Sequence, residues 1–170
     1  MLKKVSYGEA MKRKYPEAIG WATCVDEQGN PNAIALGWVM CTSGSPPMLA
    51  ISVGLTRYSH ELIEKAGEFV VVFPSEAMKD ATMVVGTKSG RDGDKMAESG
   101  VRLLPATAVK APLVDDACAN FECKLTGKLL TGDHTIFAGE VVASHVGPED
   151  ARRIYTLGGD RGFSAVRPPG

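Results

Sequence analysis

The chain has 170 residues, of which 23% are charged, and its 19 basic and 20 acidic residues give a formal net charge of −1. This length suits one ordinary domain, so we expect residues 1–170 to form a single unit with a buried core. The balanced charge excludes the strong positive field that nonspecific nucleic-acid binding needs, and no apolar run approaches the roughly 20 residues that cross a bilayer.

The N-terminal part of the chain predicts a helix followed by a β-hairpin. A capping-box pattern at residues 6–9 predicts a helix through Tyr15, which ends because Pro16 cannot continue it. Residues 18–40 then indicate two strands joined by a polar turn, in which Gly29 supplies the permissive backbone. Antiparallel pairing is expected from the start of the chain.

The middle of the chain alternates short strands and short helices. Residues 48–53, "MLAISV", predict a buried strand, and residues 68–73, "EFVVVF", predict another. Between them, "SHELIEKA" predicts a helix with Ser59 as its N-cap and Gly67 just past its end.

A polar, glycine-rich loop follows the next predicted helix. Ser75 is expected to cap that helix, which runs to about Val85. The loop, "GTKSGRDGDK" at residues 86–95, leads into one further turn of helix that ends at Gly100. So many charged and small residues together make this loop a candidate ligand site.

The last third of the chain predicts a second, longer hairpin. Residues 119–130 and 134–146 are long β runs joined around "TGD". A short helix is expected after Pro148, followed by a Gly- and Arg-containing tail at 157–170 that needs another surface to pack on. Together, these elements favour a mainly β fold, an antiparallel sheet or barrel with short peripheral helices, over alternating βαβ units.

Several common catalytic motifs are missing. The loop at 86–95 lacks GxxxxGK[ST], because Gly90 is followed by Arg91, so it is not a P-loop. "GGDRG" at 158–162 is not GxGxxG and follows a predicted helix, which excludes a Rossmann nucleotide site. The sequence also has no GxSxG and no HExxH. Hydrolase and metalloprotease functions are therefore disfavoured.

No metal site or disulfide framework is expected. The histidines are scattered through different predicted elements, and the cysteines form no CxxC pair and suit buried, reduced positions. The N-terminus has no apolar core of a secretory signal, so we expect a cytoplasmic protein. The residues concerned are His60, His134, His145, Cys24, Cys41, Cys118 and Cys123.

Two segments carry the residue types that bind anions. Ser89 and Arg91 offer a hydroxyl and a planar five-donor group, and Lys95 adds a charge at a predicted helix start. Arg57 and Ser59 lie at a second helix N-terminus, where unpaired N–H groups and the helix dipole also favour an anion. Either segment alone is equally compatible with an ordinary solvated capping loop.

Six segments, in this order and at compatible spacing, resemble the flavin reductase-like family, in particular its flavoredoxin branch of FMN-binding split barrels. The resemblance covers most of the chain. The segments are "NAIALGWVMCTSGSPPMLAISV", "RYSHELIEKAGEFVVVFP", "SGRDGDK", "VKAPLV", "FECKL" and "GDHTIFAGEVV".

The resemblance implies a Greek-key split β-barrel that forms a homodimer, with a non-covalent FMN in each of two clefts lined by both subunits. One part of the second strand would lie along the isoalloxazine, and two other segments would hold the ribityl-phosphate end. By this resemblance the flavin-contacting residues are Gly37, Trp38, Val39 and Met40, and the phosphate-end residues are Arg57, Tyr58, Ser59, Ser89, Arg91 and Lys95.

The resemblance also places His134 near the open face of the flavin, where NADH or NADPH could approach. Two simpler interpretations stay open, because a lone strand tryptophan such as Trp38 is more often core and His134 could be only a turn residue. The sequence departs from the family at Lys88, where a small residue or cysteine is common, and at Phe163, where a tyrosine is common.

Two function classes follow from the resemblance. The first is an FMN-dependent oxidoreductase of the NAD(P)H-dependent flavin reductase type. The second is a flavoredoxin-type electron carrier that keeps its FMN and passes electrons between protein partners. A third reading is a barrel that only binds a flavin or another phosphorylated ligand. No nicotinamide-binding motif separates them, since the donor can stack on the flavin without a fold of its own.

Overall fold

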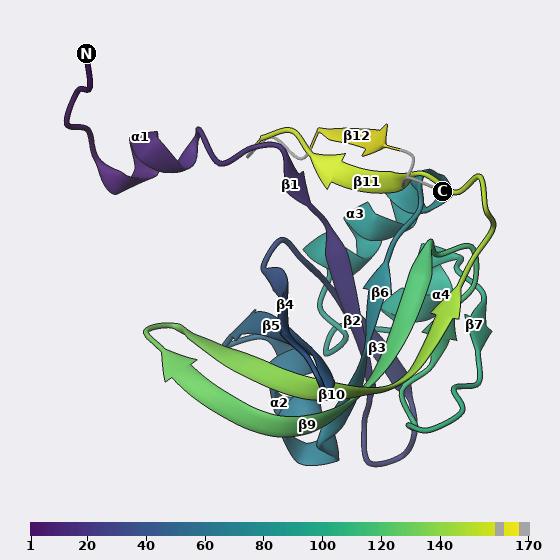
Figure 1. The fold of residues 1–170 in the computed structure, drawn as a ribbon. Helices are drawn as coiled ribbons and strands as arrows, with labels where there is room; N and C mark the ends of the chain where they lie inside the picture. The colour runs from purple at the N-terminus through teal and green to yellow at the C-terminus, as the bar shows by residue number, and fades with distance from the viewer. Residues whose placement is uncertain (159–161, 167–170) are drawn as a thin grey trace.

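The computed structural model describes residues 1–158 and 162–166, and its centre is a seven-stranded antiparallel sheet (Figure 1). The strand order is β3-β2-β6-β9-β10-β5-β4, so β5 pairs with a strand far along the chain, as a Greek-key connection requires. The predicted mainly β, antiparallel class is confirmed. The strands are β2 (Gly20–Val25), β3 (Pro31–Leu36), β4 (Val39–Gly44), β5 (Pro47–Gly54), β6 (Glu68–Phe73), β9 (Ala119–Thr131) and β10 (His134–Val146).

The turn of the first predicted hairpin is confirmed, but the predicted end of its second strand is wrong. The Asp26 carboxylate accepts the backbone N–H groups of Gln28 at 2.9 Å and Asn30 at 2.8 Å, which fixes the turn between β2 and β3. However, β3 ends at Leu36, and residues 39–44 form the separate strand β4. The second strand was predicted to continue to Met40. Instead, its pairing with β2 ends at Leu36, and the following strand β4 pairs with β5.

The second predicted hairpin is confirmed. Its two strands, β9 and β10, have 13 residues each and lie between β6 and β5 in the sheet. Register shifts at Ala138/Gly139 and Val141/Ala143 mark bulges, which bend the strands and increase their twist. At Gly139 a Cβ would lie 2.9 Å from both Phe69 Cζ and Cys123 Cβ, so only glycine lets the bent strand pack this closely.

Five short helices lie around the sheet in the described residues, and most differ slightly from their predicted bounds. The Ser6 cap is confirmed, but the first helix stops four residues before Tyr15 because none of its residues is buried. The last of the five begins after Asp94, whose carboxylate caps it. No helix within residues 1–158 and 162–166 is long and apolar enough to cross a membrane. The helices are α1 (Tyr7–Met11), α2 (Tyr58–Ala66), the 3₁₀ helix η1 (Glu76–Met78), α3 (Lys79–Thr87) and α4 (Lys95–Ser99).

One helix start was predicted wrongly and another correctly. The N-cap of α2 is Arg57, while Ser59 lies inside the first turn, where its side chain accepts a hydrogen bond from Asn32 on β3. Ser75 is the N-cap of η1, as predicted, although its side chain makes no capping bond, and α3 then continues to Thr87, two residues past the predicted end. The C-terminal signal for α2 was right, since Gly67 adopts φ +67° as a left-handed cap.

The predicted helix after Pro148 is wrong. The described part of the tail instead forms β11 (Arg153–Thr156) and β12 (Phe163–Val166). These strands make a small sheet with β1 (Glu17–Ala18), in which β11 is central and pairs with both β1 and β12. Its β1–β11 pairing joins segments from opposite ends of the sequence, which local propensity cannot anticipate. Positions 159–161 and 167–170 of the predicted tail lie outside the described residues. A third sheet pairs β7 (Leu103–Leu104) with β8 (Leu113–Val114).

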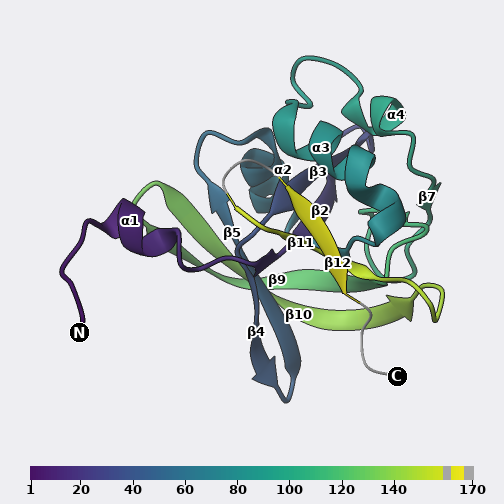
Figure 2. The same ribbon diagram turned by 90° about the horizontal axis from the view of Figure 1, so that it is seen from above.

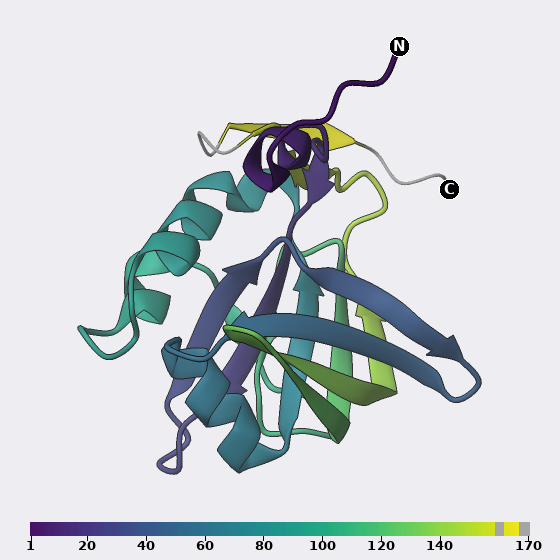
Figure 3. The ribbon, with the colours of Figure 1, turned by 90° about the vertical axis from the view of Figure 1, so that its left-hand side faces the viewer.

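Two buried clusters fill the structure. One lies between the sheet and the α3–α4 side, around Trp21 and Met78, and the other lies inside the barrel, around Phe69 and Phe137. Figure 2 shows α3 and α4 together on one side of the sheet, and Figure 3 shows the β4–β5 hairpin extending away from the barrel.

A buried carboxylate fixes the loop between β7 and β8 to the barrel. Glu122 is fully buried and accepts hydrogen bonds from the backbone N–H groups of Thr107, Ala108 and Val109. His145 Nε2 lies 2.7 Å from the same carboxylate. Burial alone would raise the pKa of Glu122, but these hydrogen bonds outweigh it and lower the pKa to about 2.

The Glu122 pKa predicts acid-sensitive stability. Because the pKa falls from 4.5 in the unfolded chain to about 2 in the folded protein, the carboxylate contributes stability above pH 4.5 that is lost as the pH falls toward 2. This contribution is on the order of 2–3 kcal/mol. We expect Glu122→Gln to lower the free energy of unfolding at pH 7 and to flatten its decline between pH 5 and 3, as measured by urea denaturation. The exposed Glu149→Gln should change neither, and an unchanged pH dependence in Glu122→Gln would contradict the assignment.

Candidate functional site

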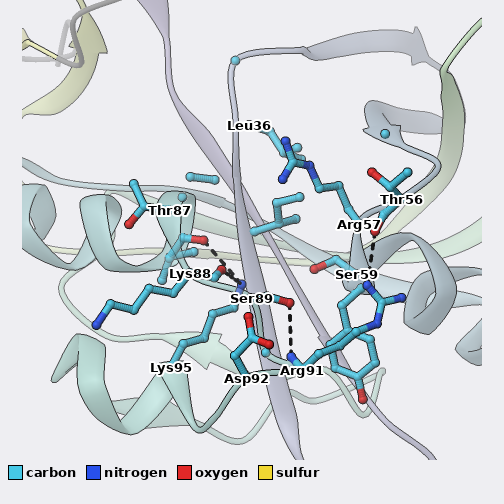
Figure 4. A pocket seen from close by; sticks show the side chains of 18 of the residues that line it. Leu36, Thr56, Arg57, Ser59, Thr87, Lys88, Ser89, Arg91, Asp92 and Lys95 are labelled. Carbon is cyan, nitrogen blue, oxygen red and sulfur yellow. Dashed lines mark hydrogen bonds between the residues drawn. The ribbon is translucent and has the colours of Figure 1, made fainter.

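A cavity of about 470 Å³ lies where the end of β3, the start of α2 and the loop after α3 meet. Figure 4 shows side chains from these three segments converging on it. The structure therefore brings both predicted anion-binding segments to one place. The predicted site residues that line the cavity are Gly37, Trp38, Arg57, Tyr58, Ser59, Ser89, Arg91, Lys95 and His134.

Arg57 provides an uncommitted positive charge in the cavity. It precedes α2, and its guanidinium extends across the cavity toward Leu36 (Figure 4). No side-chain hydrogen bond or ion pair joins Arg57 to any described residue, which leaves its five N–H donors free. The unpaired N–H groups in the first turn of α2 lie beside it and add partial positive charge. This corner of the cavity suits an anion.

Arg91 is held against α2 by three contacts. Its Nη1 donates to the Thr56 carbonyl and its Nη2 to Glu61 Oε2, both at 3.2 Å, and its guanidinium carbon lies 5.0 Å from the Tyr58 ring centre. The hydrogen bond from Lys65 and then that from Arg91 lower the pKa of the Glu61 carboxyl. Because Arg91 and Glu61 are each about half exposed, this ion pair is weak and can open toward another anion.

The two lysines of the loop have different surroundings. Lys88 is exposed and forms an ion pair with Glu98. Lys95 is 6% exposed, and its Nζ donates to the carbonyls of Lys88 at 3.2 Å and Val85 at 3.4 Å at the end of α3. Burial lowers the pKa of the Lys95 ammonium. Lys95 therefore supports the loop from below while adding positive charge to the cavity wall.

The loop itself is shaped by a local turn and a glycine. The Ser89 hydroxyl accepts the Arg91 N–H at 3.2 Å, and the Asp92 N–H bonds to the Ser89 carbonyl at 3.1 Å. At Gly90 a Cβ would lie 2.4 Å from Asn32 Oδ1, so the backbone passes directly over this buried asparagine. Asn32 was not among the predicted site residues.

Two rings form another part of the cavity lining, next to Arg57, since a Cβ at Gly54 would lie 3.5 Å from His134 Nε2 and 3.6 Å from Arg57 Cγ. Trp38 and His134 have ring centres 4.8 Å apart, and His134 Nδ1 lies 2.7 Å from Asp133 Oδ1. Trp38 is 45% exposed, so the alternative that it belongs to the barrel core is wrong. Lys14 approaches the outer face of Trp38, 5.6 Å from the ring centre. The cavity thus has a basic end and an aromatic end.

Val39 and Met40 lie outside the cavity lining. Val39 packs against the cluster inside the barrel, and Met40 is 52% exposed on β4. Gly37 does line the cavity, and a Cβ there would lie 3.2 Å from the Glu17 carboxylate. Of the predicted strand segment, Gly37 and Trp38 therefore face the cavity directly.

Comparison with known proteins identifies the family. The model of the flavin reductase like domain matches residues 11–164. The chain belongs to this family. An uncharacterised protein of Archaeoglobus fulgidus is 40% identical over 122 residues, covering 71% of this chain and 67% of its own length. A flavin reductase of Pseudomonas putida is 28% identical over 158 residues, covering 92% of this chain and 89% of that protein.

The flavin reductase-like chain also matches solved structures over nearly its whole length. Flavoredoxin of Desulfovibrio vulgaris (Miyazaki F) superposes with a TM-score of 0.84 at 26% identity, covering 99% of this chain and 96% of that one. The predicted split β-barrel fold is confirmed. The match to a protein of Aeropyrum pernix covers 91% of this chain but only 55% of that protein, which is therefore longer. The match to a protein of Pyrococcus abyssi covers 66% of this chain and 64% of that protein.

Sequence reasoning missed several residues that shape the cavity. Gly54 and Thr56 line it, and Glu61 restrains Arg91, yet none carries a motif that marks a site. Asn32 was also missed. Its only signal was a polar residue among the apolar positions of a predicted strand, which indicates a buried polar group with a specific partner.

Proposed function

We propose that this flavin reductase-like chain binds FMN non-covalently in the cavity and acts as an oxidoreductase that takes electrons from NADH or NADPH. The observation that carries the proposal is the shape of one cavity, which has donors for an anion at one end and a strand with an aromatic rim at the other. Its volume of about 470 Å³ lies within the usual range for small-molecule sites.

The basic end fits a phosphate monoester. Such a group carries nearly two negative charges near pH 7 and is bound best by several charge-assisted donors. Arg57 is uncommitted, Arg91 is held only by a weak ion pair, and the Ser59 and Ser89 hydroxyls line the same wall. The buried Lys95 ammonium adds charge without leaving its carbonyl partners.

The other end fits a flat ring system. FMN, when bound, supplies the redox chemistry through its isoalloxazine, and the protein contributes binding, orientation and electrostatics. The backbone from Leu36 to Trp38 forms one wall there, and Ser52 and Gly54 form another. We assign Trp38 and His134 to the mouth, where a nicotinamide ring has room to approach. The Asp133 carboxylate beside Nδ1 orients the His134 ring.

A second function, a flavoredoxin-type electron carrier, is favoured by one observation. An apolar ring at the cavity mouth faces solvent, as a contact for a redox partner would. That ring is Trp38, which is 45% exposed. The family includes proteins described both as flavin reductases and as flavoredoxins, so the electron acceptor is the point that separates the two functions.

The first test is the response of the purified protein to FMN and nicotinamide donors. We expect added FMN to bind and give a yellow protein after desalting, and anaerobic NADH or NADPH to bleach its visible absorbance within one mixing experiment. Bound FMN that neither donor bleaches would favour the carrier. A protein that takes up no FMN would exclude both functions.

The second test concerns the Arg91–Glu61 ion pair. Arg91→Ala should raise the dissociation constant for FMN by about 10- to 100-fold, because a charged donor to the phosphate is lost. Glu61→Gln should lower that constant, since it releases Arg91 without removing it. Isothermal titration calorimetry measures both, with Glu64→Gln on the same helix as the matched control. Arg91→Ala with the affinity of the wild type would remove Arg91 from the site.

We also propose that the chain forms a homodimer in which the cavity lies at the interface between subunits. The β4–β5 hairpin projects from the barrel and carries the exposed Met40, and the β9–β10 hairpin carries the exposed Leu129 and Leu130 (Figure 3). A second copy would cover this apolar surface. Light scattering at micromolar concentration should give twice the chain mass of 18.0 kDa, and a monomer mass would overturn the proposal.

A further inference from the structure

Asn32 lies behind the basic end of the cavity, where it contacts both anion-binding segments. It sits on β3, is 4% exposed and does not line the main cavity. Its Nδ2 lies 2.7 Å from Ser59 Oγ and 3.7 Å from Cys24 Sγ. Its Oδ1 has no hydrogen-bond partner among the described residues and faces Gly90, where a Cβ would be only 2.4 Å away.

The surroundings fix the direction of these hydrogen bonds. The Cys24 thiol donates to the Asn32 backbone carbonyl at 3.7 Å, which leaves its sulfur as an acceptor. Burial raises the pKa of the Cys24 thiol to about 11, so it keeps its proton near pH 7. The two hydrogens of the Asn32 amide are therefore shared between two acceptors, Cys24 Sγ and Ser59 Oγ.

The direction of the Ser59 hydroxyl proton follows from counting the hydrogen bonds that this hydroxyl makes. A serine hydroxyl has a single proton and two lone pairs, and one lone pair here accepts the Asn32 amide. Cys24 also hydrogen-bonds this hydroxyl, but its sulfur is only a weak acceptor. Ser59 is 2% exposed and lines the cavity. An anion in the cavity is a much stronger acceptor than a thiol sulfur, so the serine proton would donate to it.

We propose that Asn32 is a positioning residue that commits the Ser59 hydroxyl to act as a donor toward the phosphate end of the cavity. The inference rests on the proposed binding of FMN. The same amide packs its oxygen against Gly90. One buried side chain therefore sets both the direction of the Ser59 donor and the position of the loop that carries Ser89 and Arg91.

The test compares FMN with riboflavin, which lacks the phosphate. Asn32→Asp replaces the amide donor with a carboxylate that accepts the Ser59 proton and turns the serine lone pairs toward the cavity. We expect the dissociation constant for FMN to rise by about tenfold or more, while that for riboflavin changes by less than about threefold. A merely structural role would weaken both ligands alike, and that result would overturn the proposal.

A double-mutant cycle with Ser59→Ala separates hydrogen-bond direction from the added charge. In the Ser59→Ala background, Asn32→Asp should lower the preference for FMN over riboflavin by much less than it does in the wild type. Equal effects in the two backgrounds would mean that the added charge acts alone, and would overturn the proposal.

Two further measurements keep the result interpretable. Circular dichroism melts establish whether Asn32→Asp folds. If it does not, the cycle is run with Asn32→Ala, where coupling to Ser59→Ala supports the proposal and strict additivity contradicts it. A wild-type protein that binds neither flavin refutes the proposed function. A wild-type protein that binds both, with Asn32 variants unchanged, refutes only this inference.

Discussion

The site depends on the pairing of β10 with β5. In this register His134 lies opposite Gly54, and the backbone N–H of Leu55 bonds to the Asp133 carbonyl at 3.0 Å. The Gly54 carbonyl in turn accepts the Arg57 N–H at 3.0 Å, which sets the start of α2. A slip of one residue would turn every side chain of β10 to the opposite face. The aromatic and basic ends of the cavity therefore share one hydrogen-bonded frame.

The positively charged side chains around the cavity differ in how firmly their hydrogen-bond partners hold them. Arg57 has no side-chain partner among the described residues, Arg91 forms a half-exposed ion pair with Glu61, and Lys95 is fixed beneath the loop by two carbonyls. Concentrating positive charge has a cost, because like charges repel and buried charges lose hydration. Spreading the charges over different depths limits that cost and leaves the outer guanidinium groups free to recognise a ligand.

Sequence reasoning succeeded where local chemistry decides the structure. The Asp26 turn, the Ser6 cap and the Gly67 cap depend on residues close in the chain, and all three were predicted. It failed where a distant partner decides, as in β11, which pairs with β1 rather than forming a helix. The two anion-binding segments were found from their residue types, whereas Gly37, Trp38, Tyr58 and His134 were found by resemblance. The depth of Lys95 and the contact of Asn32 with Ser59 depend on packing between elements that no motif records.

The small sheet of β1, β11 and β12 has a consequence for how the molecule is made. Its β1–β11 pairing joins Glu17 to Thr156, so the sheet cannot close until the residues up to Thr156 have been synthesised. Beside the main cavity, Tyr15, Thr156 and Phe163 line a second hollow of about 260 Å³ that shares Leu36 and Gly37 with it. Because contacts distant in sequence form slowly, this flank of the cavity forms only after all seven strands of the main sheet have been made.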